Sequence, residues 1–388
     1  MGERGIPLIA VSAAWGGFWG SWSALLPAIK EQLGASPAEL GLALSAVPVG
    51  AIPAMAVAGR LAGGRERTAL IAVTVAFALS VVAIAPAGSP TALGLTLLLV
   101  GMTSGALDVT LNMATGRAER EHGRRLFQQV HAAFPLAVIV AAPATGLARS
   151  LGLGTGTVLV VTAALVLASS ASLPALRLGR GLPATGGAGG RRRWTVAIVL
   201  GALTGCALII ENSIEQWSVL LLEDHRGASA LVSSAAPAVY MAALTVGRIA
   251  AQALPRFTLR TFYLVGGVGG LAGMALAGLG GSVLASMAGF ALTGLALGPL
   301  VPAVLSRAAA DDASGVLVST VSAISYTGFV ISPLLVAALT DRLGLPGALA
   351  ALGLLAVPLV GRYFAERPRR HRPRGRWRRP RLTDFQRK

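Results

Sequence analysis

The amino-acid sequence predicts an all-α integral membrane protein, with twelve transmembrane helices arranged as two six-helix bundles. Three observations support this fold class: the composition, the spacing of apolar runs, and a repeat between the two halves. Of the 388 residues, 54% are hydrophobic and only 13% are charged. A soluble domain of ordinary composition carries about 25% charged residues. The composition therefore indicates that most of the chain contacts lipid.

The apolar runs are long enough to cross a membrane, because a transmembrane helix needs about 20 mainly apolar residues. We expect helices over residues 6–29, 38–60, 68–87, 91–116, 126–148, 153–176, 194–222, 229–254, 260–280, 282–306, 315–340 and 345–364. The first run is too long for the apolar region of a signal peptide, and no small-residue cleavage site follows it. We therefore interpret it as a retained helix.

The basic residues between the runs alternate along the chain. The even-numbered loops carry most of them, whereas the odd-numbered loops carry Lys30, Arg149, Arg226 and Arg342. Because cytoplasmic loops are enriched in Arg and Lys, we expect the even-numbered loops and both termini to be cytoplasmic. The expected location is the cytoplasmic membrane.

The net charge of +17 does not indicate a nucleic-acid partner, because eleven of the 33 basic residues lie in the last 22 positions. A cytoplasmic tail of this kind is attracted to anionic lipid by about 1 kcal/mol per nearby Arg. We interpret it as a topology anchor; the alternative is an arm for nucleic acid or a protein partner. The single cysteine, Cys206, excludes a disulfide framework within the chain, and we expect no cofactor or metal.

The two halves repeat one pattern on either side of a Gly-rich, basic linker. Trp22 and Trp217 each begin a Trp-Ser, apolar stretch, charged turn and Gly-Ala-Ser series, followed by a helix that ends in Gly-Arg. We expect a first bundle over 1–176, a linker over 177–193, a second bundle over 194–364 and a tail over 365–388. The repeated arginines, Arg60 and Arg248, are gating candidates near the inner helix ends; the alternative is that they extend toward the inner surface.

This organisation resembles the major facilitator superfamily over the chain up to about residue 364. GALDVTLNMAT, FQQVHAAFPLAVIVAAPATG and ENSIEQWS further resemble a branch of bacterial permeases near the fucose and sugar permeases. The resemblance implies a transporter that works by alternating access. Two features depart from it: the first run has no carboxylate, and GRLAGGRER lacks the aspartate of the usual loop signature, so the gating ion pair of that signature is not expected.

The fourth run carries the acid-x-x-x-Asn element of that branch, at Asp108 and Asn112. The two side chains share one helix face, and charged groups in membrane helices usually face a cavity or a partner. An aspartate that alternates between protonation and pairing with Arg would couple protons to transport. Asp108 is therefore a proton-coupling candidate and Asn112 a substrate-binding candidate. The alternative is a structural strut from Asp108 to Arg60 or Arg248.

The seventh run carries two acids that the repeat places opposite glycines, Glu211 opposite Gly16 and Glu215 opposite Gly20. The resemblance implies that the first helix of each bundle lines the central cavity. Glu211 and Glu215 are therefore proton-coupling candidates, and Asn212 is a substrate-binding candidate. The alternative for Glu215 is an acid at the wet end of its helix.

Aromatic side chains lie deep in the first run. Trp15 and Trp19 are substrate-binding candidates, because a mid-membrane ring that faces the bundle can stack on a sugar or an apolar substrate; the alternative is that they fill a helix interface. Trp22 is a candidate for the outer aromatic belt. His131, near the start of the fifth run, is a further substrate-binding candidate, with a satisfied interfacial histidine as the alternative.

These features predict a secondary transporter rather than an enzyme, because no nucleophile–base set, metal motif or nucleotide-binding loop is found. We expect proton-coupled import of a neutral polar, sugar-like solute by a monomer in the lipid bilayer. The alternative is proton-antiport efflux of an amphiphilic or cationic compound. A membrane enzyme or a transport-derived sensor is a further alternative.

Overall fold

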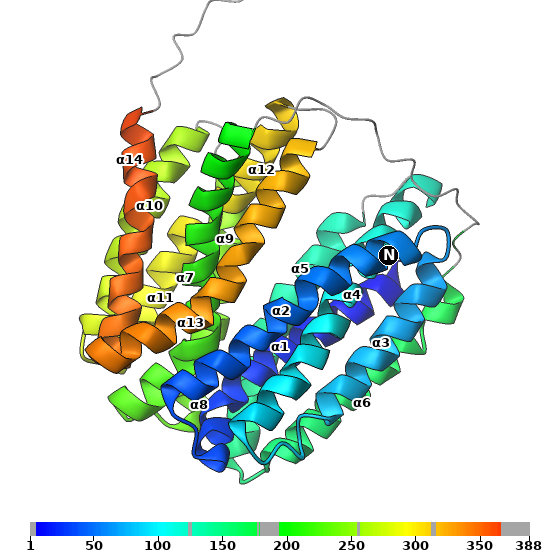
Figure 1. Ribbon diagram of the computed structural model, residues 1–388, viewed down its shortest axis with the longest axis horizontal. Helices are drawn as coiled ribbons and strands as arrows, with labels where there is room; N and C mark the ends of the chain where they lie inside the picture. Colours follow the sequence, from blue (N-terminus) through cyan, green and yellow to red (C-terminus); the bar gives the residue numbers. More distant parts are fainter. Residues whose placement is uncertain are drawn as a thin grey trace, which may run out of the picture.

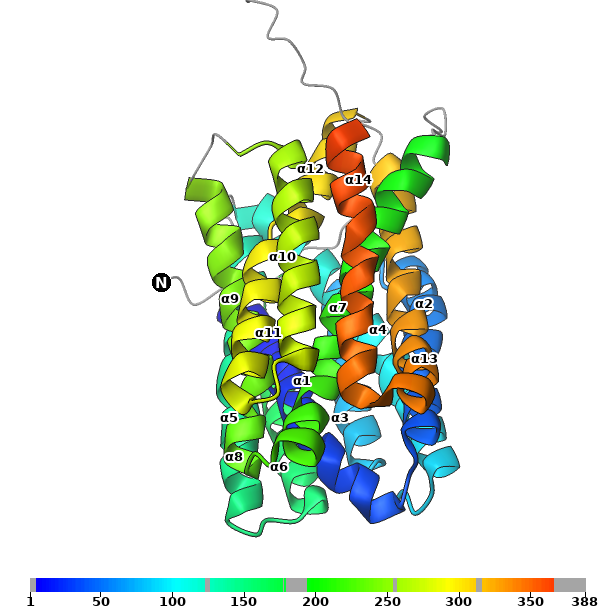
Figure 2. The ribbon, with the colours of Figure 1, turned by 90° about the vertical axis from the view of Figure 1, so that its left-hand side faces the viewer.

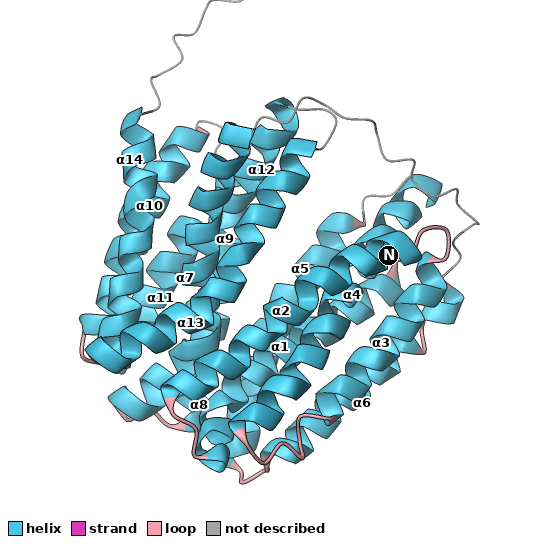
Figure 3. Cartoon of the chain, viewed as in Figure 1, coloured by secondary structure: helices cyan, strands magenta, loops and turns pink. Residues whose placement is uncertain are grey.

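A computed structural model describes residues 5–122, 126–176, 178, 194–253, 257–311 and 316–365. Over these ranges the regular structure is helical throughout (Figure 3). The helices are α1 (Ile6–Leu33), α2 (Pro37–Leu61), α3 (Glu66–Val82), α4 (Pro90–His122), α5 (Phe127–Ser150), α6 (Thr155–Ser170), α7 (Trp194–Arg226), α8 (Ala230–Ser233), α9 (Ala235–Ala253), α10 (Leu259–Leu279), α11 (Val283–Leu297), α12 (Leu300–Asp311), α13 (Val316–Leu352) and α14 (Val357–Ala365), with 3-10 turns at Leu173–Ala175 and Gly353–Ala356. Except for Leu178 and Ala365, the expected linker and tail lie outside the described residues.

The connection between α1 and α2 shows how local sequence sets the helix ends. Gly34 ends α1 with a φ of +58°, a conformation that glycine adopts without strain. Ser36 then begins α2 with a capping box, in which its hydroxyl accepts from the Glu39 N–H at 3.2 Å and the Glu39 carboxylate accepts from the Ser36 N–H at 2.9 Å. The chain therefore reverses within a few residues.

The described residues contain nine segments that are long and apolar enough to cross a membrane. One of them, Leu317–Ala365, contains two helices that meet at Gly344, where φ is +68°. Helices α1 and α3 are not among the nine, and they pack against helices that are. The protein is therefore a multi-pass, all-α membrane protein. The total of twelve transmembrane helices stays a prediction.

Two of the predicted runs each correspond to two consecutive helices in the structure. The eighth consists of α8 and α9, which Ser234 separates. The tenth consists of α11 and α12, which Gly298 and Pro299 separate, because proline has no N–H to continue the helical hydrogen bonds. Near this second interruption, the Gly298 carbonyl accepts a hydrogen bond from the Arg248 side chain.

The helices form two bundles, α1–α6 and α7–α14 (Figure 1). In the first, α1 packs on α5, α2 on α4 and α3 on α6; in the second, α7 packs on α13 and α10 on α11. Figure 2 shows α9, α11, α10 and α14 side by side across one face of the second bundle. Large side chains such as Phe18, Phe77, Tyr263 and Phe290 fill the interiors and are fully buried.

The bundles meet at one end and diverge toward the other (Figure 1). The meeting end holds α8 and the carboxyl ends of α1, α5 and α7, whereas the start of α1 and the end of α14 lie at the diverging end. At the meeting end, Gly41 lies against Pro333 and Ala337 of the other bundle, and a Cβ there would be within 2.8 Å of their atoms. We call these the closed end and the open end.

Candidate functional site

An acidic cluster lies on α7, where Glu211 and Glu215 stand one turn apart and are both half-buried. The Tyr240 hydroxyl of α9 donates to Oε2 of Glu211 at 3.4 Å. Glu215 forms no hydrogen bond or ion pair with any described residue. The two acids therefore differ: Glu211 has a phenolic partner, and Glu215 keeps both oxygens available.

Arg248 of α9 is the cation that belongs to this cluster. Its charge acts on Glu211 and on Glu215, and its Nε donates to the carbonyl of Gly298 at 3.1 Å, at the break between α11 and α12. It forms no ion pair with either acid among the described residues. Arg248 lies five residues before the end of α9 (Ala235–Ala253), near the helix end where the sequence suggested a gate, and its role as a gate stays a prediction.

Asp108 supplies a carboxylate from the first bundle. It is half-buried on α4 and accepts a hydrogen bond from Nδ2 of Asn112 at 2.8 Å, one turn along the same helix. It forms no ion pair with a described residue, so the suggested strut to Arg60 or Arg248 is absent from this structure. The expected pairing of Asp108 with Asn112 on one face is present.

Tyr326 of α13 is a further polar group near these acids. The charges of Asp108 and Glu211 both act on its hydroxyl, and its ring lies 5.4 Å from that of Phe329. Helix α13 also packs on α7, which carries Glu211. We group Asp108, Glu211, Glu215, Tyr240, Arg248 and Tyr326 as one polar region. This region is the candidate site.

The tryptophans of α1 have three different surroundings. Nε1 of Trp15 donates to Ser104 of α4 at 2.9 Å, and the Trp15 ring meets Phe134 of α5 edge-to-face at 4.9 Å. Trp19 is half-buried and meets Phe18 edge-to-face at 5.0 Å. Both rings thus contribute to helix packing while retaining an exposed part.

The suggestion that Trp22 belongs to an outer aromatic belt is wrong. Its side chain is fully buried, and its Nε1 donates to Oε1 of Gln216 on α7 at 3.2 Å. The reason is that α1 and α7 meet at the closed end, so that a residue near the end of α1 faces protein instead of the lipid interface.

The remaining candidates lie apart from the acids or face other groups. Asn212 is 8% exposed, and its Oδ1 has no partner among the described residues. His131 is exposed near the start of α5 and stacks on Phe127 at 5.7 Å; the Arg248 charge acts on it as well. Arg60 is exposed at the end of α2 and forms no ion pair with a described residue.

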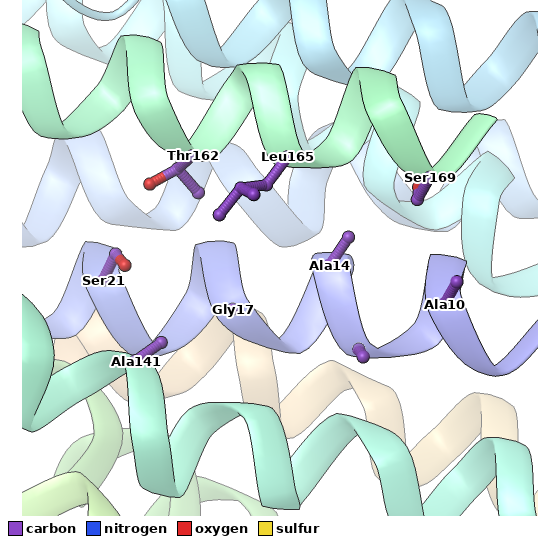
Figure 4. Close-up of a pocket in the computed structure, with 9 residues that line it drawn as sticks. Ala10, Ala14, Gly17, Ser21, Ala141, Thr162, Leu165 and Ser169 are labelled. Carbon is purple, nitrogen blue, oxygen red and sulfur yellow. The ribbon is translucent and has the colours of Figure 1, made fainter. Parts of the chain in front are cut away.

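A recess of about 420 Å³ lies between α1, α5 and α6 and contains none of these candidates (Figure 4). Gly17 and several alanines line it, together with Thr162, Leu165 and Ser169 of α6. The Thr162 and Ser169 hydroxyls donate to carbonyls of their own helix. The recess is therefore largely apolar and has no charged group to bind a polar solute.

Several site residues were not anticipated from the sequence. Tyr240, Tyr326 and Ser104 lie in apolar runs and carry no charge to mark them, and only the packing of α9, α13 and α4 brings them to the acids and to Trp15. A tyrosine in the middle of a membrane run was the one available signal, because its hydroxyl needs a partner when buried.

Comparisons with known proteins agree with this architecture. The profile of the Major Facilitator Superfamily matches residues 8–307. An MFS-type transporter of Yersinia pestis is 26% identical over 347 residues, which cover 88% of this chain and 90% of the relative. A variant of the nucleoside transporter NupG superposes with a TM-score of 0.76 at 15% identity, over 93% of this chain and 99% of that one. A D-xylose-proton symporter superposes with a TM-score of 0.76 at 13% identity, over 93% and 97% of the two chains.

Proposed function

The chain belongs to the Major Facilitator Superfamily, a family of transporters and not of enzymes, and on this premise we propose that it imports a neutral polar, sugar-like solute together with protons. That it is a secondary transporter of a small solute follows from the family. The solute, the direction and the coupling ion are our proposal. The observation that carries it is that each bundle holds a half-buried carboxylate inside a membrane helix, Asp108 bonded to Asn112 at 2.8 Å and Glu211 bonded to Tyr240 at 3.4 Å.

Proton coupling is supported by the hydrogen-bond partners and the nearby charges of these carboxylates. A charged carboxylate inside a membrane is costly, so it takes up a proton or lies beside a cation or hydrogen-bond donor. Asp108 has only the Asn112 amide, and Glu211 has the Tyr240 hydroxyl and the nearby charge of Arg248. Each of these partners lies in the same bundle as its carboxylate. Movement of one bundle against the other would therefore act on ionisation by changing the distance between Asp108 and the charged groups of the second bundle.

A neutral polar solute is supported by the mixture of groups. Amide, carboxylate and phenol groups provide both donors and acceptors, and an aromatic ring such as Trp15 offers a face on which a sugar ring can stack. We propose Asn112, Asn212, Trp15, Trp19 and His131 as substrate-binding residues. Arg248 is the one cation that we assign to the cluster, and two acids lie beside it, which disfavours an anionic solute.

Glu215 favours one second candidate function, the efflux of a cationic or amphiphilic compound in exchange for protons. Its carboxylate has no hydrogen-bond partner among the described residues and stands beside a second acid. Because two acids share the single nearby charge of Arg248, a bound organic cation would balance the second carboxylate. The two functions differ in the charge of the solute and in the direction of proton movement.

We further propose the membrane arrangement that the basic loops indicate. The open end, with the start of α1 and the end of α14, would face the cytoplasm, and the protein would act as a monomer in the cytoplasmic membrane. The proposed divisions are 1–176 and 194–364 for the bundles, 177–193 for the linker and 365–388 for the tail. Arg60 and Arg248 would act as gating residues near the cytoplasmic ends of α2 and α9.

The test is solute-driven proton movement in proteoliposomes, preceded by a thermal-shift screen of sugars, amines and hydrophobic cations. We expect a neutral polar solute to stabilise the protein and to drive proton uptake with it. Asp108→Asn should abolish the proton movement while the protein stays folded. Asp311→Asn is the matched control, because Asp311 pairs with Arg307 one turn away on α12, outside the cluster.

Two results would contradict the proposal. Unchanged proton coupling in Asp108→Asn would remove the role of Asp108. Stabilisation by organic cations alone, with protons moving against the solute, would replace import by the efflux alternative.

A further inference from the structure

The closed end is held by side-chain bonds that cross from one bundle to the other. Arg149 at the end of α5 pairs with Glu223 at the end of α7, with Nη1 to Oε1 at 2.7 Å and Nη2 to Oε2 at 3.0 Å. Lys30 at the end of α1 pairs with Asp224 at 2.5 Å. We call these four residues the latch.

The Arg149–Glu223 pair has the geometry of a strong contact. It is bidentate, which adds direction to the charge attraction, and its side chains are 12% and 17% exposed. Arg149 also donates to the carbonyl of Ala24 at 2.9 Å, and Glu223 also accepts from the Ser233 hydroxyl at 2.6 Å. Both charges are thus satisfied from several sides, as partly buried charges need to be.

The Lys30–Asp224 pair is weaker by the same criteria. Its side chains are 28% and 35% exposed, and a single distance joins the two groups. Exposed pairs of this kind contribute little because water and salt screen them. The two halves of the latch should therefore differ in effect, with Arg149–Glu223 dominant.

Beside the latch, α5 packs closely against the second bundle, which brings the oppositely charged latch residues within hydrogen-bonding distance of each other. Gly146 of α5, one turn before Arg149, lies against Ala230 and Ser234 of the other bundle, and a Cβ there would be within 2.6 Å of their atoms. Toward the membrane centre, the Trp22–Gln216 bond forms a second crossing contact. Gln216 and Glu223 are seven residues apart and so share one face of α7.

The sequence contains a signal for this arrangement. Lys30 and Arg149 are two of the few basic residues in the odd-numbered loops, where such residues are scarce. The consecutive acids Glu223 and Asp224 end the seventh run. Pairing across the bundles explains why basic residues stand at these two positions on the otherwise weakly basic side.

At the open end, ion pairs join residues of the same bundle. Arg117 of α4 pairs with Glu66 of α3 and Glu121 of α4, and Arg307 pairs with Asp311 on α12. Arg117–Glu66 joins two helices of the first bundle, whereas the other two pairs each lie within one helix. The cross-bundle pairs Arg149–Glu223 and Lys30–Asp224 stand at the opposite end.

We propose that the latch is the gate of the closed end: Arg149–Glu223 holds the bundles together there and must separate for the solute to pass that side. The inference rests on the proposed alternating access, because a gate has a role only if this end opens. α7 would then carry both the gate, at Glu223, and the acids of the site, at Glu211 and Glu215.

The experiment measures the closed end directly, without solute. Cys206→Ser provides a cysteine-free background, and nitroxide labels at Leu151→Cys on the first bundle and Leu284→Cys on the second report the separation by electron spin resonance. Both positions are exposed, at 71% and 80%. We expect Glu223→Gln to raise the ratio of long to short distances about tenfold, since a hydrogen bond to a charged group contributes roughly that factor.

Three further variants make the result specific. The double variant Arg149→Glu with Glu223→Arg should restore the short distance, because it reverses the pair without removing it. Asp224→Asn should change the ratio less than about threefold, as for an exposed pair. Asp311→Asn, which breaks a pair within one bundle, should leave the distances unchanged.

Unchanged distances in folded Glu223→Gln, with wild-type elution and melting temperature, would overturn the proposal. So would an effect of equal size from Asp311→Asn, because the cause would then be general destabilisation. If the distances change as expected while no solute drives proton movement, the latch stands and the proposed coupling fails. The two inferences can therefore fail separately.

Discussion

Helices α1 and α7 are the first helices of the two repeated halves, but one face of α1 packs against a neighbouring helix and the matching face of α7 carries acids. On α1 the positions are Gly16 and Gly20, and on α7 they are Glu211 and Glu215. A Cβ at Gly16 would overlap the backbone of Phe134 on α5, so this face of α1 is a packing surface. The same face of α7 holds acids near Tyr240 and the Arg248 charge.

The difference shows that a repeat conserves the helix and not the use of its face. Close backbone packing excludes a carboxylate, since neither the side chain nor its hydration fits there. On α7 the glycine contacts lie nearer the start, where Gly201 meets Ile324 of α13 and Gly205 lies against Gly328. The later turns are packed as well, since Trp217, Leu220 and Leu221 are at most 1% exposed. Within them Glu211 and Glu215 stay half-buried, so this face of α7 keeps room for polar groups that α1 lacks.

The largest effect is expected from a side chain added to the packing face of α1. Gly16→Leu places a side chain where the Phe134 backbone lies, and we expect a destabilisation of about 3 kcal/mol or more, because a packed backbone cannot move aside. Thermal unfolding and elution of the detergent-solubilised protein measure the effect. Normal folding of this variant would show that α1 and α5 are not closely packed.

The next change removes the charge from α7 while keeping its shape. Glu211→Gln retains an acceptor for Tyr240 but does not take up a proton, so we expect proton-driven uptake to fall more than about tenfold, or about 1.4 kcal/mol. Proton-independent exchange of solute should persist. Glu215→Gln is the matched variant with the smaller expected loss, and the reverse order would reassign the main coupling role to Glu215.

A smaller effect is expected where α1 and α7 meet. Trp22→Phe keeps a ring beside Phe18 but removes the N–H that bonds Gln216 at 3.2 Å. The buried Gln216 oxygen then lacks this donor, at a cost of about 1 kcal/mol to the closed state. The Leu151–Leu284 label pair should show a corresponding increase in long distances; no change would mean that the contact is incidental.

The smallest effect on stability is expected from a substitution at Gly17, the residue next to Gly16. Gly17 of α1 faces the apolar recess, and a Cβ there meets no atom within 4 Å. Gly17→Ala should therefore leave the melting temperature and uptake within experimental error of wild type. A loss comparable to that of Gly16→Leu would indicate that any enlargement of α1 is harmful, whatever its direction.

Much of the fold was predictable because lipid imposes simple rules. A backbone in hydrocarbon must satisfy its own hydrogen bonds, so long apolar runs become helices, and the runs at 126–148 and 260–280 match α5 and α10 within two residues. The runs at 229–254 and 282–306 are each one apolar span, Ala230–Ala253 and Val283–Ala308, but the short irregularities at Ser234 and Gly298–Pro299 were not predicted. The spacing of hydrophobic residues does not show where a long apolar helix becomes irregular, because the residues on both sides of that point are apolar.

The sequence by itself determined the helices, the two-part repeat and the pairing of Asp108 with Asn112, because each depends on residues close together in the chain. The tertiary structure was needed to show that Tyr240 bonds Glu211, that Trp22 is buried against α7, and that Arg149 reaches Glu223. Those contacts depend on how each helix is rotated and where it crosses its neighbour. Small residues such as Gly16 and Gly146 set that geometry by allowing backbones to touch.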